Sequence, residues 1–457
     1  MNTAASPTAS LNICSEDYGL LTDLYQLTMA ACYVGEGIDQ RPASFELFTR
    51  RLPEGFGYLI AMGLAQVIDY LANLRFGSAQ IEQLQASGIF HHAPAAFWQL
   101  LTDAKFTGDL WAVPEGTAVF ANEPLLRVEA PLWQAQLVET YLLNTLNYQT
   151  LIATRAARMR DVAGAEATIL EFGTRRAFSP QASVWAARAA IAGGFNATSN
   201  VLAALQLGQN PTGTMAHALV MAIAALEGSE TEAFAAFHRY FPGAPLLIDT
   251  YDTLAAARHL AQTLEAGEGT LAGVRIDSGD LTTVTNQVRS LLPGVPIFAS
   301  GDLDESEILR LKQAGAVIDG YGIGTKLVTG RPVNGVYKLV EIEGIPVMKE
   351  SSGKLTYPGR KQIFRRVENG LILSDRLGLA TDSVAPRETS LLQPVIKQGQ
   401  QLYADDDLTT IAARTAKSVA SLPPAVRQIG NPAPFAVNLS SSLDSLTQAT
   451  RQRSTTP

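Results

Sequence analysis

The stretch Ala167-Thr168-Ile169-Leu170-Glu171-Phe172-Gly173-Thr174-Arg175-Arg176 places an apolar, strand-like run directly before a polar turn that contains glycine. The same pattern returns further along the chain, with helical stretches such as residues 304–314 between the runs. Strand, polar turn and helix in repetition are typical of parallel β/α units. The later runs are Pro245 to Ile248, Gly273 to Ile276, Val295 to Ala299 and Ala316 to Ile318.

This repetition predicts an α/β fold with a β/α barrel over residues 151–330, although a doubly wound open sheet gives the same pattern. In a barrel, the residues just past the strand ends form the active face. Residues 1–150 mix helices with short strands, and residues 331–425 return to strands and turns. We therefore expect a second, α+β domain built from both ends of the chain. Residues 426–457, rich in Ser, Thr, Gln and Pro, predict a mobile tail.

Composition limits the classes of function. With 457 residues, 47% of them hydrophobic, the chain can bury one large core and a smaller one. A net charge of −8 argues against nucleic acid or an anionic membrane surface as the main partner. Cys14 and Cys32 fit no disulfide framework or metal spacing, and the start lacks a signal peptide. No apolar run approaches the roughly 18 residues of a membrane helix. We expect a cytoplasmic protein.

Three turns of small residues indicate where the active site lies. They are residues 171–176, residues 194–200 and residues 213–217. Paired guanidiniums, hydroxyls and one imidazole are poor core material, but they suit a pocket for phosphates and a planar ring. Because the net charge is negative, local arginines must meet any anionic substrate.

Seven motifs in order resemble nicotinate phosphoribosyltransferase. The resemblance implies an irregular barrel like that of type II phosphoribosyltransferases, in a homodimeric, ligase-type enzyme of NAD salvage. Such an enzyme joins nicotinate to 5-phosphoribosyl 1-diphosphate, and ATP hydrolysis is coupled to the reaction. The motifs are Asp23-Leu24-Tyr25-Gln26-Leu27-Thr28-Met29, Glu171-Phe172-Gly173-Thr174-Arg175-Arg176-Ala177, Ala197-Thr198-Ser199-Asn200-Val201, Gly213-Thr214-Met215-Ala216-His217, Asp249-Thr250-Tyr251-Asp252-Thr253, Gly273-Val274-Arg275-Ile276-Asp277-Ser278-Gly279-Asp280 and Gly322-Ile323-Gly324-Thr325.

The resemblance assigns nicotinate to Tyr25, Phe172, Ser199, Thr214 and Arg275. Phe172 offers a ring face for stacking, and Tyr25 covers the other face from the partner subunit. Arg275 grips the carboxylate, to which a serine hydroxyl can donate. Related nicotinamide enzymes have an aspartate at the position of Ser199, which would repel a carboxylate. Ser199 therefore predicts specificity for the acid. The alternative is that Thr198, Ser199 or Asn200 only caps a helix beginning near Val201.

The phosphate end is assigned in the same way. On an extended segment Arg175 and Arg176 point opposite ways, and by resemblance Arg175 faces the pocket. A surface ion pair is the alternative. The ribose 5-phosphate is placed on two glycine turns whose backbone N–H groups phosphate can approach closely, although a strand-to-helix turn also needs glycine. The residues of these turns are Ser300, Gly301, Asp302, Gly322, Gly324 and Thr325.

His217 is the most specific single hypothesis. A lone histidine in an otherwise apolar helix is commonly a core residue, but the resemblance implies a phosphohistidine formed from ATP. With Asp277 and Arg275 it completes the predicted catalytic set. Mg²⁺ is the expected cofactor, with Asp249 and Asp280 as candidate ligands; acidic residues at strand ends can also be helix caps.

Three other functions remain to be weighed. A nicotinamide phosphoribosyltransferase is disfavoured by Ser199. A quinolinate phosphoribosyltransferase of the same fold leaves His217 unexplained. A non-catalytic metabolite-binding relative is disfavoured by the intact Arg175, His217, Arg275 and Asp277.

Overall fold

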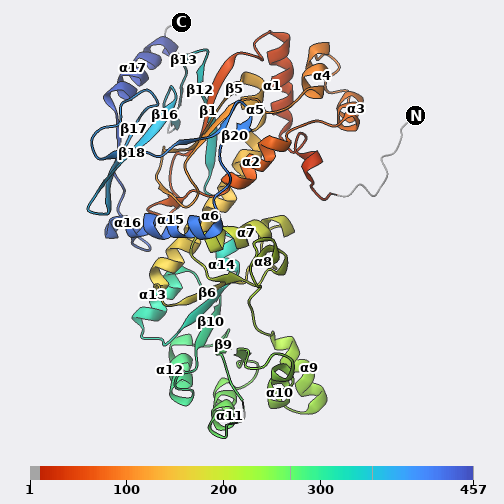
Figure 1. Cartoon of the computed structure of the whole chain (residues 1–457), viewed down its shortest axis with the longest axis vertical. Coiled ribbons are helices and arrows are strands. Elements are labelled where there is room, and N and C mark those ends of the chain that lie inside the picture. Colours follow the sequence, from red (N-terminus) through yellow and green to blue (C-terminus); the bar gives the residue numbers. More distant parts are fainter. Residues whose placement is uncertain (1–10, 268, 352–353, 456–457) are drawn as a thin grey trace.

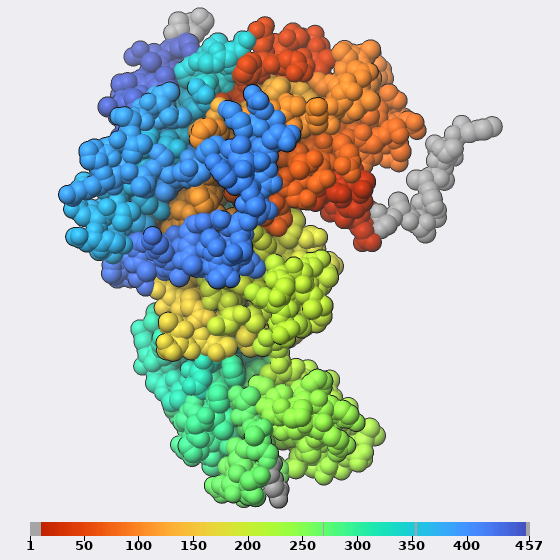
Figure 2. Space-filling view, viewed as in Figure 1, coloured from red at the N-terminus to blue at the C-terminus, as the bar shows by residue number. Residues whose placement is uncertain are grey.

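The computed structural model describes residues 11–267, 269–351 and 354–455. Figure 1 shows two bodies along the long axis of the molecule. The mixed body combines the red and orange N-terminal part with the blue C-terminal part, and the barrel body holds the green to teal middle. The space-filling view in Figure 2 shows the red and orange part of the chain and the blue part packed together in the mixed body. No helix among the described residues is long and apolar enough to cross a membrane.

One antiparallel sheet joins the two ends of the chain in the mixed body. Strand β1 pairs on one side with β5 and on the other with β12, so that Phe45 lies opposite both Val128 and Leu339. Residues 43–49 of β1 are buried, and Phe45 and Leu47 belong to the core of the mixed body. The sheet order is β13 (Ile345–Pro346), β12 (Gly335–Ile342), β1 (Pro42–Thr49), β5 (Pro124–Pro131), β3 (Asp109–Ala112), β19 (Gln393–Lys397) and β20 (Gln400–Gln401).

A second sheet holds the end of the chain in place. Its order is β18 (Glu388–Ser390), β16 (Lys361–Glu368), β17 (Leu371–Leu379) and β21 (Val437–Leu439). Helix α17 (Ser441–Thr455) packs against β17, and Leu443 is fully buried. The mobile tail predicted over residues 426–457 is therefore wrong for the described residues. Its few apolar side chains reach the core, which composition alone could not indicate.

Helices surround these sheets and join the bodies. The N-terminal part contributes η1 (Ser15–Asp17), α1 (Leu24–Gly35), α2 (Leu64–Asn73), α3 (Ser78–Ala86), α4 (Ala95–Thr102) and α5 (Leu132–Leu137). The long α6 (Glu139–Ala163) then enters both cores. Leu142 and Leu146 belong to the core of the mixed body, whereas Ile152 and Met159 belong to the core of the barrel body. Helices α15 (Leu408–Ala420) and α16 (Pro424–Arg427) follow near the C-terminus.

The barrel body is a parallel sheet in cyclic order. The strand order in this sheet is β7-β6-β11-β10-β9-β8. Strand β11, the last of the six along the chain, therefore pairs with β6, the first. This order is that of a barrel and not of a doubly wound sheet. The barrel is irregular because, among the described residues, β7 and β8 are not hydrogen-bonded to each other and the sheet does not close. The strands are β6 (Thr168–Glu171), β7 (Ala197–Thr198), β8 (Leu246–Leu247), β9 (Val274–Ile276), β10 (Ile297–Gly301) and β11 (Gly320–Ile323).

Helices fill the connections between these strands. Three of them, α8, α9 and α10, stand between β7 and β8, where the ladder is interrupted. The helices are α7 (Pro180–Ala192), α8 (Val201–Gln206), α9 (His217–Glu227), α10 (Glu230–Tyr240), α11 (Thr253–Glu265), α12 (Leu281–Leu291), α13 (Glu305–Gln313) and α14 (Thr325–Val328).

The last strand differs from its prediction. The apolar run Ala316 to Ile318 is not a strand, and β11 instead occupies Gly320–Ile323 within the predicted phosphate turn. Glycine is needed there for packing. A Cβ on Gly320 would lie 2.6 Å from the ring of Phe298, and one on Gly322 would lie 2.5 Å from the ring of Phe172. Only Gly324 and the residues after it lie beyond the strand.

Candidate active site

The predicted functional residues follow the carboxyl ends of the parallel strands. Phe172 follows β6, Asp249 lies two residues after β8, and Asp277 follows β9. Asp302 follows β10, and Gly324 follows β11. Because the strands are parallel, these ends meet on one face of the barrel.

Phe172 and Arg275 lie beside each other at the ends of β6 and β9. The guanidinium carbon of Arg275 lies 5.8 Å from the centroid of the Phe172 ring. One Nη of Arg275 donates to the backbone oxygen of Met215 at 2.8 Å, while its buried Nε has no partner among the described residues. Burial lowers the pKa of Arg275, and the carboxylates of Asp277 and Asp249 oppose this. A cation with a free donor therefore stands beside an aromatic ring.

Ser199 does not cap helix α8, which was the alternative to its role in substrate binding. Asn200 is the N-cap of α8, because its side chain accepts from the backbone N–H of Ala203 at 3.0 Å. Ser199 donates its backbone N–H to the carbonyl of Glu171 at 2.9 Å, which ties it to the end of β6. Its hydroxyl makes no hydrogen bond in the part of the chain that the structure describes. A Cβ on Gly213 would lie 3.8 Å from Ser199, so the turn that carries Thr214 passes close by.

His217 is the first residue of α9, and each of its ring nitrogens faces a polar neighbour. Its Nδ1 lies 3.1 Å from the hydroxyl of Thr250. Its Nε2 lies 3.8 Å from Oδ1 of Asp249, whose side chain is only 2% exposed against 40% for the imidazole. That Oδ1 is buried without a hydrogen bond among the described residues. His217 is thus a partly exposed imidazole over a buried carboxylate, and not a core histidine.

A chain of hydrogen bonds connects this carboxylate to the phosphate end. Oδ2 of Asp249 accepts from the backbone N–H of Asp277 at 2.8 Å and from the Ser278 hydroxyl at 2.7 Å. Oδ1 of Asp277 accepts from the Ser300 hydroxyl at 2.5 Å. The strand ends β8, β9 and β10 are therefore locked to one another through their acidic residues.

A cavity of about 570 Å³ adjoins Asp277 and is lined by Ser300, Gly301 and Asp302. Gly301 has φ +113°, and a Cβ there would lie 2.9 Å from the carbonyl oxygen of Asp277. The turn therefore requires glycine at this position. The other predicted phosphate residues do not line this cavity: Gly322 packs under Phe172, and Gly324 with Thr325 begins α14.

Two predicted residues lie apart from this constellation. Tyr25 is on α1 of the mixed body, 46% exposed, with its hydroxyl 3.4 Å from Glu139. Arg175 and Arg176 are both exposed in the turn after β6, but the charge of Arg175 contributes to lowering the pKa of Arg275. Arg175 is therefore the one whose field reaches the site.

Asp280 takes the helix-capping role that was the alternative to metal binding. It is the N-cap of α12, where it accepts from the backbone N–H of Thr282 and from the hydroxyl of Thr283. Its local sequence, an aspartate directly before a helix, could have indicated this cap. Within the described residues no group of three or more His, Cys, Asp or Glu side chains is placed to hold a metal ion.

Three residues that the sequence reading missed belong to the site. Thr250 holds the imidazole of His217. Lys326 lines the cavity next to Asp277. Burial, with the nearby charges of Asp249 and Asp252, raises the pKa of Glu230 to about 7. Thr250 and Lys326 directly follow predicted residues, which was the only signal available for them.

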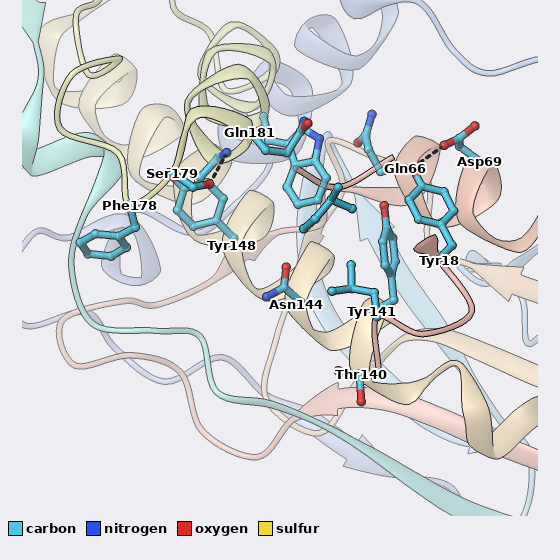
Figure 3. Close-up of a pocket in the computed structure, with 14 residues that line it drawn as sticks. Tyr18, Gln66, Asp69, Thr140, Tyr141, Asn144, Tyr148, Phe178, Ser179 and Gln181 are labelled. Carbon is cyan, nitrogen blue, oxygen red and sulfur yellow. Dashed lines mark hydrogen bonds between the residues drawn. The ribbon is translucent and has the colours of Figure 1, made fainter. Parts of the chain in front are cut away.

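A separate cavity of about 600 Å³ lies between η1, α2, α6 and α7 (Figure 3). Tyr18 and Tyr141 form part of its wall with ring centroids 5.1 Å apart, and the Tyr18 hydroxyl donates to Asp69 at 3.0 Å. Its lining includes no lysine, arginine or histidine and none of the predicted site residues. A cavity without a cation is unsuited to a phosphorylated substrate, so the strand-end face is the better active site.

Comparison with known proteins gives a consistent set of matches. The model of the nicotinate phosphoribosyltransferase N-terminal domain matches residues 20–147, that of the nicotinate phosphoribosyltransferase family matches residues 167–356, and that of the C-terminal domain matches residues 380–447. A nicotinate phosphoribosyltransferase of Bacillus subtilis is 44% identical over 77% of this chain and 73% of its own length. One of Mycobacterium tuberculosis is 40% identical over 90% and 89%, respectively.

Solved structures agree with the fold. The crystal structure of human nicotinic acid phosphoribosyltransferase has a TM-score of 0.82 at 32% identity, covering 94% of this chain and 99% of that chain. The nicotinate-nucleotide pyrophosphorylase of Pyrococcus furiosus has a TM-score of 0.74 at 25% identity, covering 91% and 98%. The prediction of an irregular barrel with a second domain from both chain ends is confirmed.

Proposed function

The chain belongs to the nicotinate phosphoribosyltransferase family, and from this premise we infer that it joins nicotinate to 5-phosphoribosyl 1-diphosphate in NAD salvage. The products are nicotinate mononucleotide and diphosphate. The observation that carries this function is Arg275, a half-buried cation beside the ring of Phe172, whose Nε has no partner among the described residues. A pyridine carboxylate matches that pair, because its ring can stack while its charge is held.

Ser199 supports the acid over the amide. Its hydroxyl is free to donate, and Asn200 already caps α8. A carboxylate at this position would repel nicotinate, whereas a serine hydroxyl adds a donor beside Arg275. Thr214, on the neighbouring turn, completes the pocket. The nicotinamide and quinolinate alternatives are not favoured.

The reaction needs little proton transfer, because the pyridine nitrogen is already a nucleophile. It attacks the anomeric carbon while the bond from that carbon to diphosphate breaks, and positive charge develops on the ribose ring. Asp277 is proposed to stabilise this charge, since its carboxylate is oriented by the Ser300 hydroxyl at 2.5 Å. Arg175 and the turn Ser300 to Asp302 are proposed to hold the phosphates.

ATP coupling is proposed to act through His217. Asp249 lies nearest Nε2 and would keep the proton there, which leaves Nδ1 as the basic nitrogen facing Thr250. The γ-phosphoryl group of ATP would move to Nδ1 as ADP leaves, and water would later release phosphate. Such a step makes the overall enzyme ligase-type, because hydrolysis is tied to nucleotide synthesis.

Mg²⁺ is proposed as the cofactor that neutralises the leaving diphosphate. Mg²⁺ in such sites rests mainly on substrate phosphates and water, with one or two carboxylates. Asp249 and Asp280 are the proposed carboxylates. Asp280 is exposed, and its oxygens also accept hydrogen bonds at the start of α12.

A homodimer is proposed to complete the site. Tyr25 is half exposed on α1 of the mixed body, while Phe172 lies at the barrel face. In the proposed C2 dimer, Tyr25 of one subunit would cover the pyridine held by Phe172 of the other.

One assay tests the proposed function. Diphosphate release is measured with nicotinate, nicotinamide and quinolinate, each with and without ATP. We expect release with nicotinate only, and faster release with ATP. Equal release with nicotinamide would contradict the role of Ser199, and no release with any of the three would contradict the function itself.

A further inference from the structure

Glu171 is a fully buried carboxylate that the proposed reaction does not use. It is the last residue of β6, directly before Phe172. Burial raises the pKa of Glu171, and hydrogen bonds from Thr198 and Gly173 oppose this; no cation among the described residues pairs with it. A carboxylate that is buried without a cation is costly unless its oxygens are hydrogen-bonded. The two hydrogen-bond partners therefore indicate what Glu171 holds in place.

The two oxygens of Glu171 hold the turns after two different strands. Oε1 accepts from the backbone N–H of Gly173, the residue after Phe172, and Oε2 accepts from the hydroxyl of Thr198 at 2.5 Å. Thr198 ends β7 and lies opposite Glu171 in the parallel pairing of β6 with β7. The residue after Thr198 is Ser199. One carboxylate thus connects the turn that carries the aromatic ring to the turn that carries the serine hydroxyl.

Both ends of this connection are closely packed. The hydroxyl oxygen of Thr198 accepts from the backbone N–H of Asn200 at 2.9 Å, so its own hydrogen is left for Glu171. Gly173 has no room for a side chain, because a Cβ there would collide with Val328 and lie 2.8 Å from Oε1 of Glu171. Glu171 therefore faces two donors in fixed positions. An ionised carboxylate can accept from both, whereas a glutamine would turn its NH2 group toward one of them.

We propose that Glu171 is a positioning residue for nicotinate, which fixes the Phe172 ring relative to the Ser199 hydroxyl and so contributes to the choice of the acid over the amide. This inference rests on the proposed function for the identity of the ligand. Glu171 does not touch the pyridine itself; it acts through the residues that follow its two partners. The exposed Arg175 lies beyond Gly173 in the turn, so the phosphoribosyl donor should be affected less than the pyridine.

The first experiment measures steady-state kinetics of Glu171→Gln and Thr198→Val, which break the connection at little change in volume. Each should raise KM for nicotinate roughly threefold to tenfold, less than the loss of a direct hydrogen bond to a charged group. The donor KM and kcat should change less. The double variant should add little, because both substitutions break the same connection. Thr198→Ser keeps the hydroxyl and should stay near wild type, as should Glu265→Gln, a matched control at an exposed position on α11.

The second experiment measures binding without turnover, by calorimetry with nicotinate and with nicotinamide. Wild type should prefer nicotinate, and Glu171→Gln should reduce that preference. Unchanged nicotinate binding in Glu171→Gln overturns the inference, as does an equal loss for both pyridines, which a merely structural role would cause. If no nucleotide forms but the preference for nicotinate still depends on Glu171, then the proposed function fails and the inference stands. Thermal unfolding checks each variant, and Thr198→Val tests the same connection if Glu171→Gln does not fold.

Discussion

His217 shows how two neighbours can direct an imidazole at the scale of single residues. Asp249 lies toward Nε2 and Thr250 toward Nδ1, at 3.8 and 3.1 Å. The Asp249 carboxylate is buried, whereas the His217 imidazole is partly exposed. One edge of the ring therefore faces the protein interior, and the rest of the ring is accessible. This arrangement supports phosphoryl transfer without giving His217 a part in the bond to the pyridine.

We predict that His217→Ala abolishes the ATP-dependent gain in rate and leaves a slow basal transfer. The reason is that, in the proposed mechanism, the imidazole accepts phosphoryl but does not contact the anomeric carbon. Diphosphate release with and without ATP is the measurement, with acid-labile phosphate on the wild-type protein as the direct readout. Unchanged stimulation by ATP in the variant would contradict the prediction. His259→Ala, a histidine on α11, is the matched control.

Substrate choice is the second test at this scale. Arg275→Ala should weaken nicotinate by about 1.5–3 kcal/mol, because a charge-assisted contact is lost. Ser199→Asp should weaken nicotinate by placing a carboxylate against a carboxylate, while nicotinamide loses much less. Ser199→Asn is the uncharged control. An equal loss for both substrates in Ser199→Asp would mean that Ser199 has only a structural role.

At the scale of elements, β11 is a strand whose glycines make room for aromatic rings. Gly322→Ala would place a methyl group 2.5 Å from the ring of Phe172. We predict that overpacking lowers the free energy of unfolding by about 1–3 kcal/mol, which is measured as a lower unfolding temperature. The displaced Phe172 ring should also raise KM for nicotinate. Gly35→Ala, where nothing lies within 4 Å of the new Cβ, should leave both unchanged. An unaltered nicotinate KM in Gly322→Ala would show that the Phe172 ring does not hold the substrate.

At the scale of the whole molecule, the proposed dimer predicts complementation between two inactive variants. Tyr25→Ala and His217→Ala should each lack ATP-coupled turnover. In a mixed dimer one site has both defects and the other has neither, so statistical exchange should restore up to about a quarter of wild-type activity. Activity after re-association is the measurement. Subunit exchange without recovery would place Tyr25 at its own chain's site or away from any site.

A buried charge cluster ties the two ends of the chain together. Arg365 is bidentate on Asp375 at 2.9 and 2.6 Å, and both are buried. Glu123 is also fully buried, accepts from the backbone N–H of Phe120, and leaves Oε1 without a partner among the described residues. Burial and the charge of Asp375 raise the pKa of Glu123 well above its ordinary value of 4.5, and Arg365 opposes this.

This cluster predicts how stability depends on pH. The pKa of Glu123 is higher in the folded than in the unfolded protein. The contribution of Glu123 to the free energy of unfolding is therefore fully present below pH 4.5 and is lost as pH rises through its folded-state pKa. Glu123→Gln keeps the shape without the charge, so its unfolding temperature should fall less than that of wild type as pH rises. The exposed Glu82→Gln is the control. Parallel pH profiles for wild type and Glu123→Gln would show that Glu123 does not titrate in this range.

The sequence alone determined the features that depend on local order. Apolar runs followed by polar turns located four of the six barrel strands, β6, β8, β9 and β10, because a few adjacent residues are enough to indicate where a strand ends. Ser199, His217, Arg275 and Asp277 were predicted from motifs that resemble those of the family. Family membership followed from the order of the motifs.

Tertiary structure decided what depends on distant packing. The pairing of β1 with β12 unites residues that lie far apart in the chain, and no local pattern specifies such a pairing. Strand β11 lies past its predicted run because the rings of Phe172 and Phe298 fill the space that its glycines leave. Asp249 and Asp280 look alike as acidic residues near strand ends, yet one is buried beside an imidazole and the other caps a helix. Burial and direction of a side chain, which only the fold sets, separate the two.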